Sequence, residues 1–85
     1  MHFSFVIPVF NRPAEVDELL ESLTFQTYTN FDIVIVEDGS TLKCDKVINK
    51  YKSKLDIQYY FKSNSGPGPS RNYGVDKSNS EYFIF

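Results

Sequence analysis

Residues 33–41 read IVIVEDGST, and this stretch decides the fold. Four β-branched apolar residues in succession are typical of a strand that is covered on both faces, as in a parallel sheet between helices. The run passes directly into two carboxylates, Glu37 and Asp38, and then into Gly39 and two hydroxyl residues. A carboxylate at the tip of a buried strand is costly unless donors compensate it. Either the local backbone or a bound ligand must therefore supply those donors.

Alternating strand and helix patterns extend from this stretch in both directions. Apolar runs predict strands over residues 3–9, 31–36, 57–61 and 81–85, and helical patterns predict helices over residues 13–26, 43–52 and 69–77. Alternation at this spacing predicts right-handed strand–helix–strand units. We therefore expect the α/β fold class, with a mostly parallel sheet of about four strands and helices on both faces.

The first two predicted helices each carry an apolar stripe that should face the sheet. The spacing of three and four residues between members puts them on one side of a helix. The members are Val16, Leu19, Leu20 and Leu23 in the first helix, and Val47, Ile48 and Tyr51 in the second.

Composition bounds the possible functions. The 85 residues suffice for one small domain, and the net charge of −2 with scattered Lys and Arg argues against a nucleic-acid polymer as partner. One cysteine excludes an internal disulfide and offers no zinc ligand set. No apolar run approaches the roughly 18 residues that a membrane span needs, so we expect no membrane segment here and a cytoplasmic location.

The sequence ends at Phe85, inside the last predicted strand. An apolar strand at the edge of a sheet needs cover. We therefore expect residues 1–85 to be a single N-terminal subdomain, truncated from a longer protein. An exposed edge strand also makes self-association through this C-terminal strand an alternative.

Hydrogen-bonding side chains gather after three of the predicted strands. Asn11 and Arg12 follow the first strand, Asp38 follows the second, and residues 63–66 lead from the third towards Arg71. The carboxyl ends of parallel strands lie along one edge, where open α/β sheets bind their ligands. These residues are therefore the candidates for a binding site.

Each candidate also has a structural alternative. Asp38 and Gly39 favour a turn, and Asn11 suits the cap of the first helix. Phe10 fits either the core or a stack on a planar ligand. Arg71, which we place in the first turn of the third helix, suits an anion such as a diphosphate. Taken singly, these residues leave the alternatives open.

Three segments together resemble the N-terminal half of family 2 glycosyltransferases, which have the A-type glycosyltransferase fold. The segments are FVIPVFNRP (5–13), LLESLTFQTYTNFDIVIVEDGST (19–41) and NSGPGPSRNYGVDKSNSEYFIF (64–85). The family typically shows Ile-Pro-Val-Tyr-Asn, Gln-Thr, Asp-Asp-Gly-Ser and Arg-Asn-x-Gly in the same order. The resemblance covers nearly the whole chain, although each motif alone is weak.

The resemblance implies a site for the nucleoside diphosphate of an activated sugar, with a UDP-sugar as the expected donor. Pro8 and Phe10 would line the base pocket, Asp38 would bind uracil or ribose, and Arg71 would lie near the diphosphate. The complete set of expected nucleotide-sugar-binding residues is Pro8, Val9, Phe10, Asn11, Arg12, Asp38, Gly39 and Arg71.

This chain departs from the family pattern in two replaced residues and in two motifs that it lacks. Glu37 stands in place of the family's first aspartate, and Phe10 in place of its tyrosine. The metal-binding Asp-x-Asp would begin just beyond Phe85, and the catalytic base lies further along. For a full-length parent, the resemblance implies an inverting transferase that uses a divalent cation (Mn²⁺ or Mg²⁺). Polysaccharide biosynthesis is the expected setting, with glycoprotein and glycolipid products left open as alternatives. We expect no catalytic or metal-binding residue in this chain and no activity of the chain alone.

Two other functions compete with this interpretation. One is a catalytically incomplete α/β module that binds nucleotide weakly or self-associates through its edge strand. The other is a different α/β enzyme, such as a phosphate-dependent hydrolase or a receiver-like domain. A receiver needs acids after its first strand, where this sequence has Phe10, Asn11 and Arg12.

Overall fold

The computed structural model describes residues 3–26, 30–64, 66–77 and 82–84. Within these residues, strands and helices alternate in chain order, as the sequence predicts. The elements are β1 (Phe3–Val9), α1 (Pro13–Leu23), β2 (Phe31–Asp38), α2 (Asp45–Tyr51), β3 (Ile57–Lys62), α3 (Pro67–Lys77) and β4 (Tyr82–Ile84).

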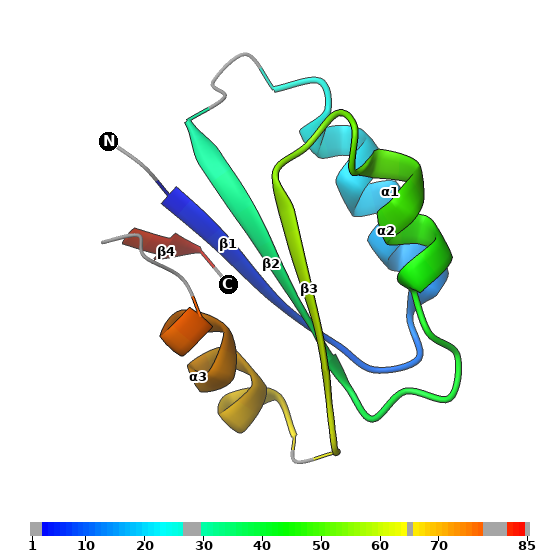
Figure 1. The fold of residues 1–85 in the computed structure, drawn as a ribbon, viewed down its shortest axis with the longest axis vertical. Coiled ribbons are helices and arrows are strands. Elements are labelled where there is room, and N and C mark those ends of the chain that lie inside the picture. The colour runs from blue at the N-terminus through cyan, green and yellow to red at the C-terminus, as the bar shows by residue number, and fades with distance from the viewer. Residues whose placement is uncertain (1–2, 27–29, 65, 78–81, 85) are drawn as a thin grey trace.

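The strands form one parallel sheet in the order β3-β2-β1-β4. The predicted α/β fold with a parallel four-stranded sheet is therefore confirmed. Because all strands run the same way, the loops after β1, β2 and β3 meet at a single edge, the lower one in Figure 1. Residues 81 and 85 of the predicted last strand lie outside the described residues. β4 lies at one edge of the sheet, and self-association through it stays a prediction.

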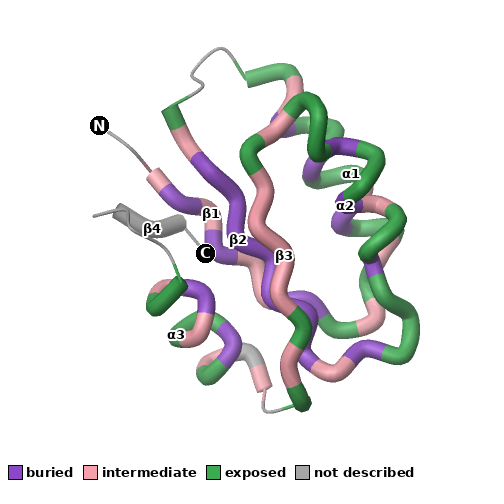
Figure 2. The backbone as a smooth tube through the Cα atoms, viewed as in Figure 1, coloured by how far each residue is buried: buried purple, intermediate pink, exposed green. Residues whose placement is uncertain are grey.

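Helices cover both faces of the sheet, with α1 and α2 on one side and α3 on the other (Figure 1). Side chains alternate between the faces of a strand, so β2 supplies both layers. Ile33 and Ile35 pack in the larger core with α1 and α2, whereas Val34 and Val36 pack in a smaller core with side chains of α3. Burial is continuous along β2 from residue 32 to residue 38 (Figure 2).

The apolar stripes of both helices are confirmed with one exception. Val16, Leu20 and Leu23 are buried in α1, but Leu19 is 37% exposed. Leu19 lies at the margin of the stripe, because the 3.6-residue turn rotates it away from the line through the other three. In α2, Ile48 and Tyr51 are buried and Val47 packs partly against them, as predicted.

Several element boundaries differ from the predicted ones. α1 ends at Leu23 rather than at residue 26, and α3 begins at Pro67 rather than at residue 69. β2 continues to Asp38, so Glu37 and Asp38 belong to the strand instead of following it. The parallel register pairs Val9 with Glu37 and Asp38 with Lys62. Pairing with the neighbouring strands thus keeps the backbone of Glu37 and Asp38 extended. Polar partners compensate the burial of their carboxylates.

Gly74 is the closest point of contact between α3 and the sheet. A Cβ placed on Gly74 would lie 2.4 Å from Cγ1 of Val6 and 3.3 Å from Cγ2 of Val36. Both valines are fully buried and stiff at χ1, so they cannot move aside easily. Glycine at this position therefore allows α3 to approach the sheet.

We expect Gly74→Ala to destabilise the protein. Alanine improves helix propensity by about 1 kcal/mol, whereas overpacking a dense core costs about 1–3 kcal/mol. Because the added Cβ would lie only 2.4 Å from Val6, the cost should fall in the upper part of this range, about 2–3 kcal/mol. The net loss of unfolding free energy should then be about 1–2 kcal/mol, measured by urea denaturation. Gly68→Ala in the same helix is the control, because a Cβ there meets nothing within 4 Å. Equal stability changes in the two variants would contradict the proposed close contact.

Candidate functional site

Glu37 is a fully buried carboxylate on the face of the sheet that α1 and α2 cover. Its Oε2 accepts a hydrogen bond from Ser40 Oγ at 2.6 Å. Its Oε1 accepts from the backbone N–H of Cys44 at 2.8 Å and from the Tyr59 hydroxyl at 2.8 Å. The carboxylate therefore ties the end of β2 to its own loop, to the start of α2 and to β3. Its donors come from the protein, so Glu37 has a structural role.

These contacts change the pKa values of Glu37, Cys44 and Tyr59. Burial pushes the pKa of Glu37 upward, but the hydrogen bonds from Ser40, Cys44 and Tyr59 outweigh it and hold the pKa below its ordinary value. Burial and the neighbouring Glu37 carboxylate raise the pKa of the Cys44 thiol to about 12 and also raise the pKa of Tyr59. Cys44 is therefore a buried, protonated thiol at neutral pH.

The lowered pKa of Glu37 makes stability depend on pH. A carboxyl group with a lowered pKa in the folded state stabilises that state above its unfolded pKa, near 4.5, and loses this contribution as the pH falls through the folded value. We expect the unfolding free energy of the parent chain to fall below pH 4.5 more steeply than that of Glu37→Gln. Urea denaturation between pH 3 and pH 7 measures the difference. Asp17, whose pKa is also lowered, is present in both chains. Parallel curves would show that Glu37 does not carry this dependence.

Asp38 points to the opposite face, because successive strand residues alternate. It is 4% exposed, and its Oδ2 accepts the backbone N–H of Gly66 at 2.9 Å. Its Oδ1 forms an ion pair with Lys62 Nζ at 3.2 Å. Its carbonyl oxygen accepts the side-chain amide of Asn64 at 3.3 Å. Asp38 thereby fastens the loop between β3 and α3 to the end of β2.

Asn11 joins the loops that follow β1 and β2. Its φ of +52° lies in the left-handed region, which asparagine tolerates better than most residues. Its Oδ1 accepts the backbone N–H groups of Thr41 and Leu42 at 2.8 and 2.9 Å, and its own N–H donates to Ser40 Oγ at 2.8 Å. Asn11 therefore does not cap α1. The residue at the N-cap position is Arg12, and its side chain makes no capping hydrogen bond.

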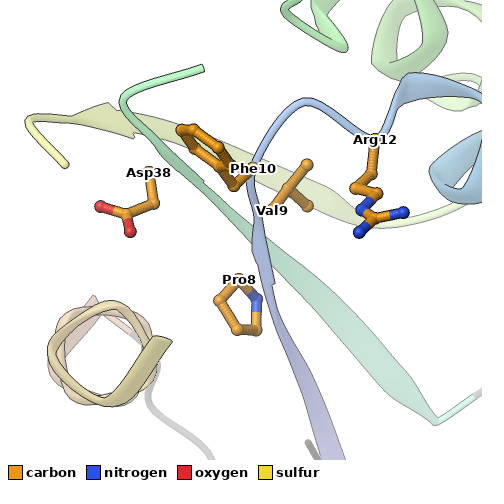
Figure 3. A pocket seen from close by; sticks show the side chains of 5 residues that line it. All are labelled: Pro8, Val9, Phe10, Arg12 and Asp38. Carbon is orange, nitrogen blue, oxygen red and sulfur yellow. The ribbon is translucent and has the colours of Figure 1, made fainter. Parts of the chain in front are cut away.

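A pocket of about 390 Å³ opens at the carboxyl ends of β1 and β2, lined by Pro8, Val9, Phe10, Arg12 and Asp38. Figure 3 shows Asp38 and Pro8 on the side towards α3, Arg12 on the other side of β1, and Phe10 between them. Phe10 is 49% exposed and so is not a core residue. Arg12 is exposed and lies 3.6 Å from Glu15. An exposed ring, a cation and a fixed carboxylate thus surround one cavity.

A second pocket of about 580 Å³ shares Pro8 with the first and continues along α3. Its other lining residues are Gly68, Arg71 and Asn72. Arg71 lies in the second turn of α3 and not in the first, because the helix begins two residues earlier than predicted. The exposed guanidinium of Arg71 still lines the pocket beside the first one. The two pockets thus adjoin at Pro8: the first carries Phe10, Arg12 and Asp38, and the second carries Arg71 and Asn72.

The structure brings six of the eight predicted site residues together around these pockets. They are Pro8, Val9, Phe10, Arg12, Asp38 and Arg71. Asn11 and Gly39 line neither pocket. They instead fix the conformation of the loops that follow β1 and β2. The predicted set of eight residues did not include Lys62 or Asn72. Lys62 was detectable only from the register, which places it directly beside Asp38 on the neighbouring strand.

The described residues do not fit a bound metal ion. Among them, no group of three or more His, Cys, Asp and Glu side chains is placed to hold one. The acidic side chains of the site, Glu37 and Asp38, point to opposite faces of the sheet and are engaged by protein donors. No chemical step at this site is therefore assigned to a metal.

The fold is that of an α/β protein whose two described pockets lie at the carboxyl ends of parallel strands. The model of the family described as Glycosyl transferase family 2 matches residues 4–85. The chain therefore belongs to glycosyltransferase family 2. An uncharacterized glycosyltransferase of Rickettsia bellii is 39% identical over 82 residues, covering 96% of this chain and 12% of the relative.

A solved structure is similar to this chain over its whole length. The crystal structure of Staphylococcus aureus TarS 1-349 superposes with a TM-score of 0.91 at 34% identity, covering 100% of this chain and 26% of TarS 1-349. The fold is thus that of the A-type glycosyltransferases. The same TarS fragment has also been solved in complex with UDP-GlcNAc, with a TM-score of 0.89 at 34% identity.

The chain spans a minor part of the relatives that it matches. It covers 16% of the poly(ribitol-phosphate) beta-N-acetylglucosaminyltransferase TarS of S. aureus strain Mu50, at 35% identity. In the described part of this chain, no helix has both the length and the apolar character to cross a membrane.

Proposed function

We propose that this chain is the donor-binding part of a glycosyltransferase that transfers sugar from a UDP-sugar to an acceptor hydroxyl with inversion. The observation that carries the proposal is the pair of adjoining pockets, with Phe10 and Asp38 in the first and Arg71 in the second. Its support from relatives is the pair of TarS complexes with UDP-GlcNAc and UDP, which align with this chain over its full length. UDP-GlcNAc is therefore the first donor to test.

The two pockets suit the two parts of a nucleoside diphosphate, the nucleoside and the diphosphate. A planar base would stack on the exposed ring of Phe10, a contact that contributes about 1–3 kcal/mol in base-binding proteins. The ionised carboxylate of Asp38 would accept a hydrogen bond from an N–H of the base or a hydroxyl of the ribose. Arg71 would face the diphosphate, whose oxygens match a guanidinium.

In the proposed reaction, the acceptor oxygen attacks the anomeric carbon as the bond from that carbon to the diphosphate breaks. The acceptor proton passes to a general base, which we assign to no residue of this chain. Arg71 would stabilise the charge that develops on the departing diphosphate. The divalent cation expected for a full-length parent finds no ligand set among the described residues, so it is given no step here. A cytoplasmic location and inactivity of the chain alone stay predictions.

We expect Asp38→Asn to weaken UDP binding by at least about tenfold. A hydrogen bond to a charged group contributes about 1.5–3 kcal/mol, and 1.4 kcal/mol corresponds to a factor of ten in Kd. Amide chemical shifts recorded during titration of the ¹⁵N-labelled chain with UDP measure the affinity. Asp76→Asn, on the exposed surface of α3, is the matched control.

The titration also tests the proposal as a whole. Shifts that centre on residues 8–12 and 66–72 support it. Absence of UDP and UDP-GlcNAc binding at millimolar concentration would overturn the donor-binding role. Equal UDP affinity in Asp38→Asn and the parent chain would overturn the role given to Asp38.

A further inference from the structure

Lys62 forms an ion pair with Asp38, a carboxylate of the proposed donor site. Among the described ion pairs, this one joins two largely buried side chains. Lys62 ends β3, and the parallel register places it directly beside Asp38 on β2. Their side chains are 17% and 6% exposed, and Lys62 Nζ lies 3.2 Å from Asp38 Oδ1. The other pairs, Arg12 with Glu15 and Lys50 with Asp17, are far more exposed.

The position of Lys62 separates it from the ligand space. Neither pocket is lined by Lys62, whereas Asp38 lines the first. The ammonium group is turned towards protein oxygens, because it also donates to the carbonyl oxygen of Ser63 at 2.8 Å. Lys62 therefore contacts the site through the Asp38 carboxylate.

Asp38 needs such a partner in order to act on a ligand. A carboxylate that is 4% exposed has lost most of its hydration, which is expensive unless a cation and hydrogen bonds replace the water. Lys62 engages Oδ1 and the Gly66 N–H engages Oδ2. Two donors on two different oxygens fix the plane of the carboxylate.

We propose that Lys62 is a positioning residue that holds the Asp38 carboxylate charged and oriented for the nucleoside half of the donor. This inference rests on the proposed function, since it concerns the same site. It differs from a direct contact between Lys62 and the diphosphate, which a lysine at this edge would also suit. The two roles predict different behaviour towards uridine, which has no phosphate.

The test compares uridine and UDP on Lys62→Met, which keeps the length of the side chain and removes its charge. We expect Kd to rise about tenfold for both ligands, by the same factor, in titrations followed by amide shifts. Lys62→Arg should restore both affinities to within about threefold of the parent chain. Lys46→Met, on the exposed surface of α2, should leave both unchanged.

A double variant tests whether Lys62 acts through Asp38. If it does, adding Lys62→Met to Asp38→Asn causes no further loss of uridine affinity, because the two residues form one unit. The amide resonance of Gly66, whose N–H donates to Asp38, should also shift in ligand-free Lys62→Met. A role in stability alone would lower the melting temperature of Lys62→Met and leave the affinity of the folded chain for both ligands unchanged. If Lys62→Met does not fold, Lys62→Gln takes its place in the same comparisons.

Two results would overturn the inference while leaving the proposed function intact. One is a loss of UDP affinity with unchanged uridine affinity, which would mean that Lys62 contacts the diphosphate. The other is an additive loss in the double variant. Failure of the parent chain to bind either ligand would instead overturn the proposed function, and the inference with it.

Discussion

Replacing Glu37 by alanine is expected to lower the free energy of unfolding by about 3–5 kcal/mol. The carboxylate accepts hydrogen bonds from Ser40, from the backbone of Cys44 and from Tyr59. Each buried donor left without a partner costs about 1–3 kcal/mol, and relief from burying a charge offsets part of the sum. Domains of this size have total stabilities of about 5–15 kcal/mol. The variant should therefore lie close to the limit of folding.

Graded replacements at Glu37 separate charge from hydrogen bonding. Glu37→Gln keeps one acceptor oxygen and should lose less stability than Glu37→Ala. Glu15→Ala, which removes an exposed carboxylate 3.6 Å from Arg12, should change stability by less than about 0.5 kcal/mol. Urea and thermal denaturation measure all three variants. A loss below 1 kcal/mol in Glu37→Ala would contradict the structural role given to this carboxylate.

Replacing Gly39 by alanine is expected to cost about 3 kcal/mol. Gly39 has a φ of +68°, where a side chain costs about 1–2 kcal/mol. A Cβ there would also lie 2.7 Å from the backbone nitrogen of Asn64 and 3.0 Å from its Cα. Backbone cannot swing away as a side chain does, so the loop after β3 must shift, at an overpacking cost of about 1–3 kcal/mol.

Gly66→Ala is the matched control, because it isolates the backbone conformation. Gly66 has a φ of +93°, but a Cβ there meets nothing within 4 Å. We expect it to lose less stability than Gly39→Ala by about the cost of the contact with Asn64. Thermal unfolding distinguishes them, since about 1 kcal/mol shifts the melting temperature by several degrees in a domain of this size. Equal melting temperatures would show that the close approach is unimportant.

Much of the fold is predictable because it depends on local patterns. The β-branched run of residues 33–36 and the stripe of Val16, Leu20 and Leu23 identify a buried strand and its covering helix. Their alternation then predicts a parallel sheet with helices on both faces. Boundaries were less predictable: β2 runs on to Asp38 because partners on other segments compensate two carboxylates that local pattern treats as an ending.

The site was predictable in position and only partly in its contacts. Parallel strands bring their ends to one edge, so the grouping of Phe10, Asp38 and Arg71 followed from order along the chain. The role of Asn11 did not follow, because its oxygen is engaged by a loop 30 residues away in sequence. Lys62 likewise acquires a role only through the register of β3 on β2.

By itself, the sequence IVIVEDGST determined a buried strand, its place in an α/β sheet and the presence of two carboxylates at the ligand edge. The sequence alone could not assign different roles to the two carboxylates. The tertiary structure separates their roles, because successive residues of a strand face opposite sides of the sheet. Glu37 turns under α2 and meets three protein donors, whereas Asp38 turns towards α3, pairs with Lys62 and lines the pocket.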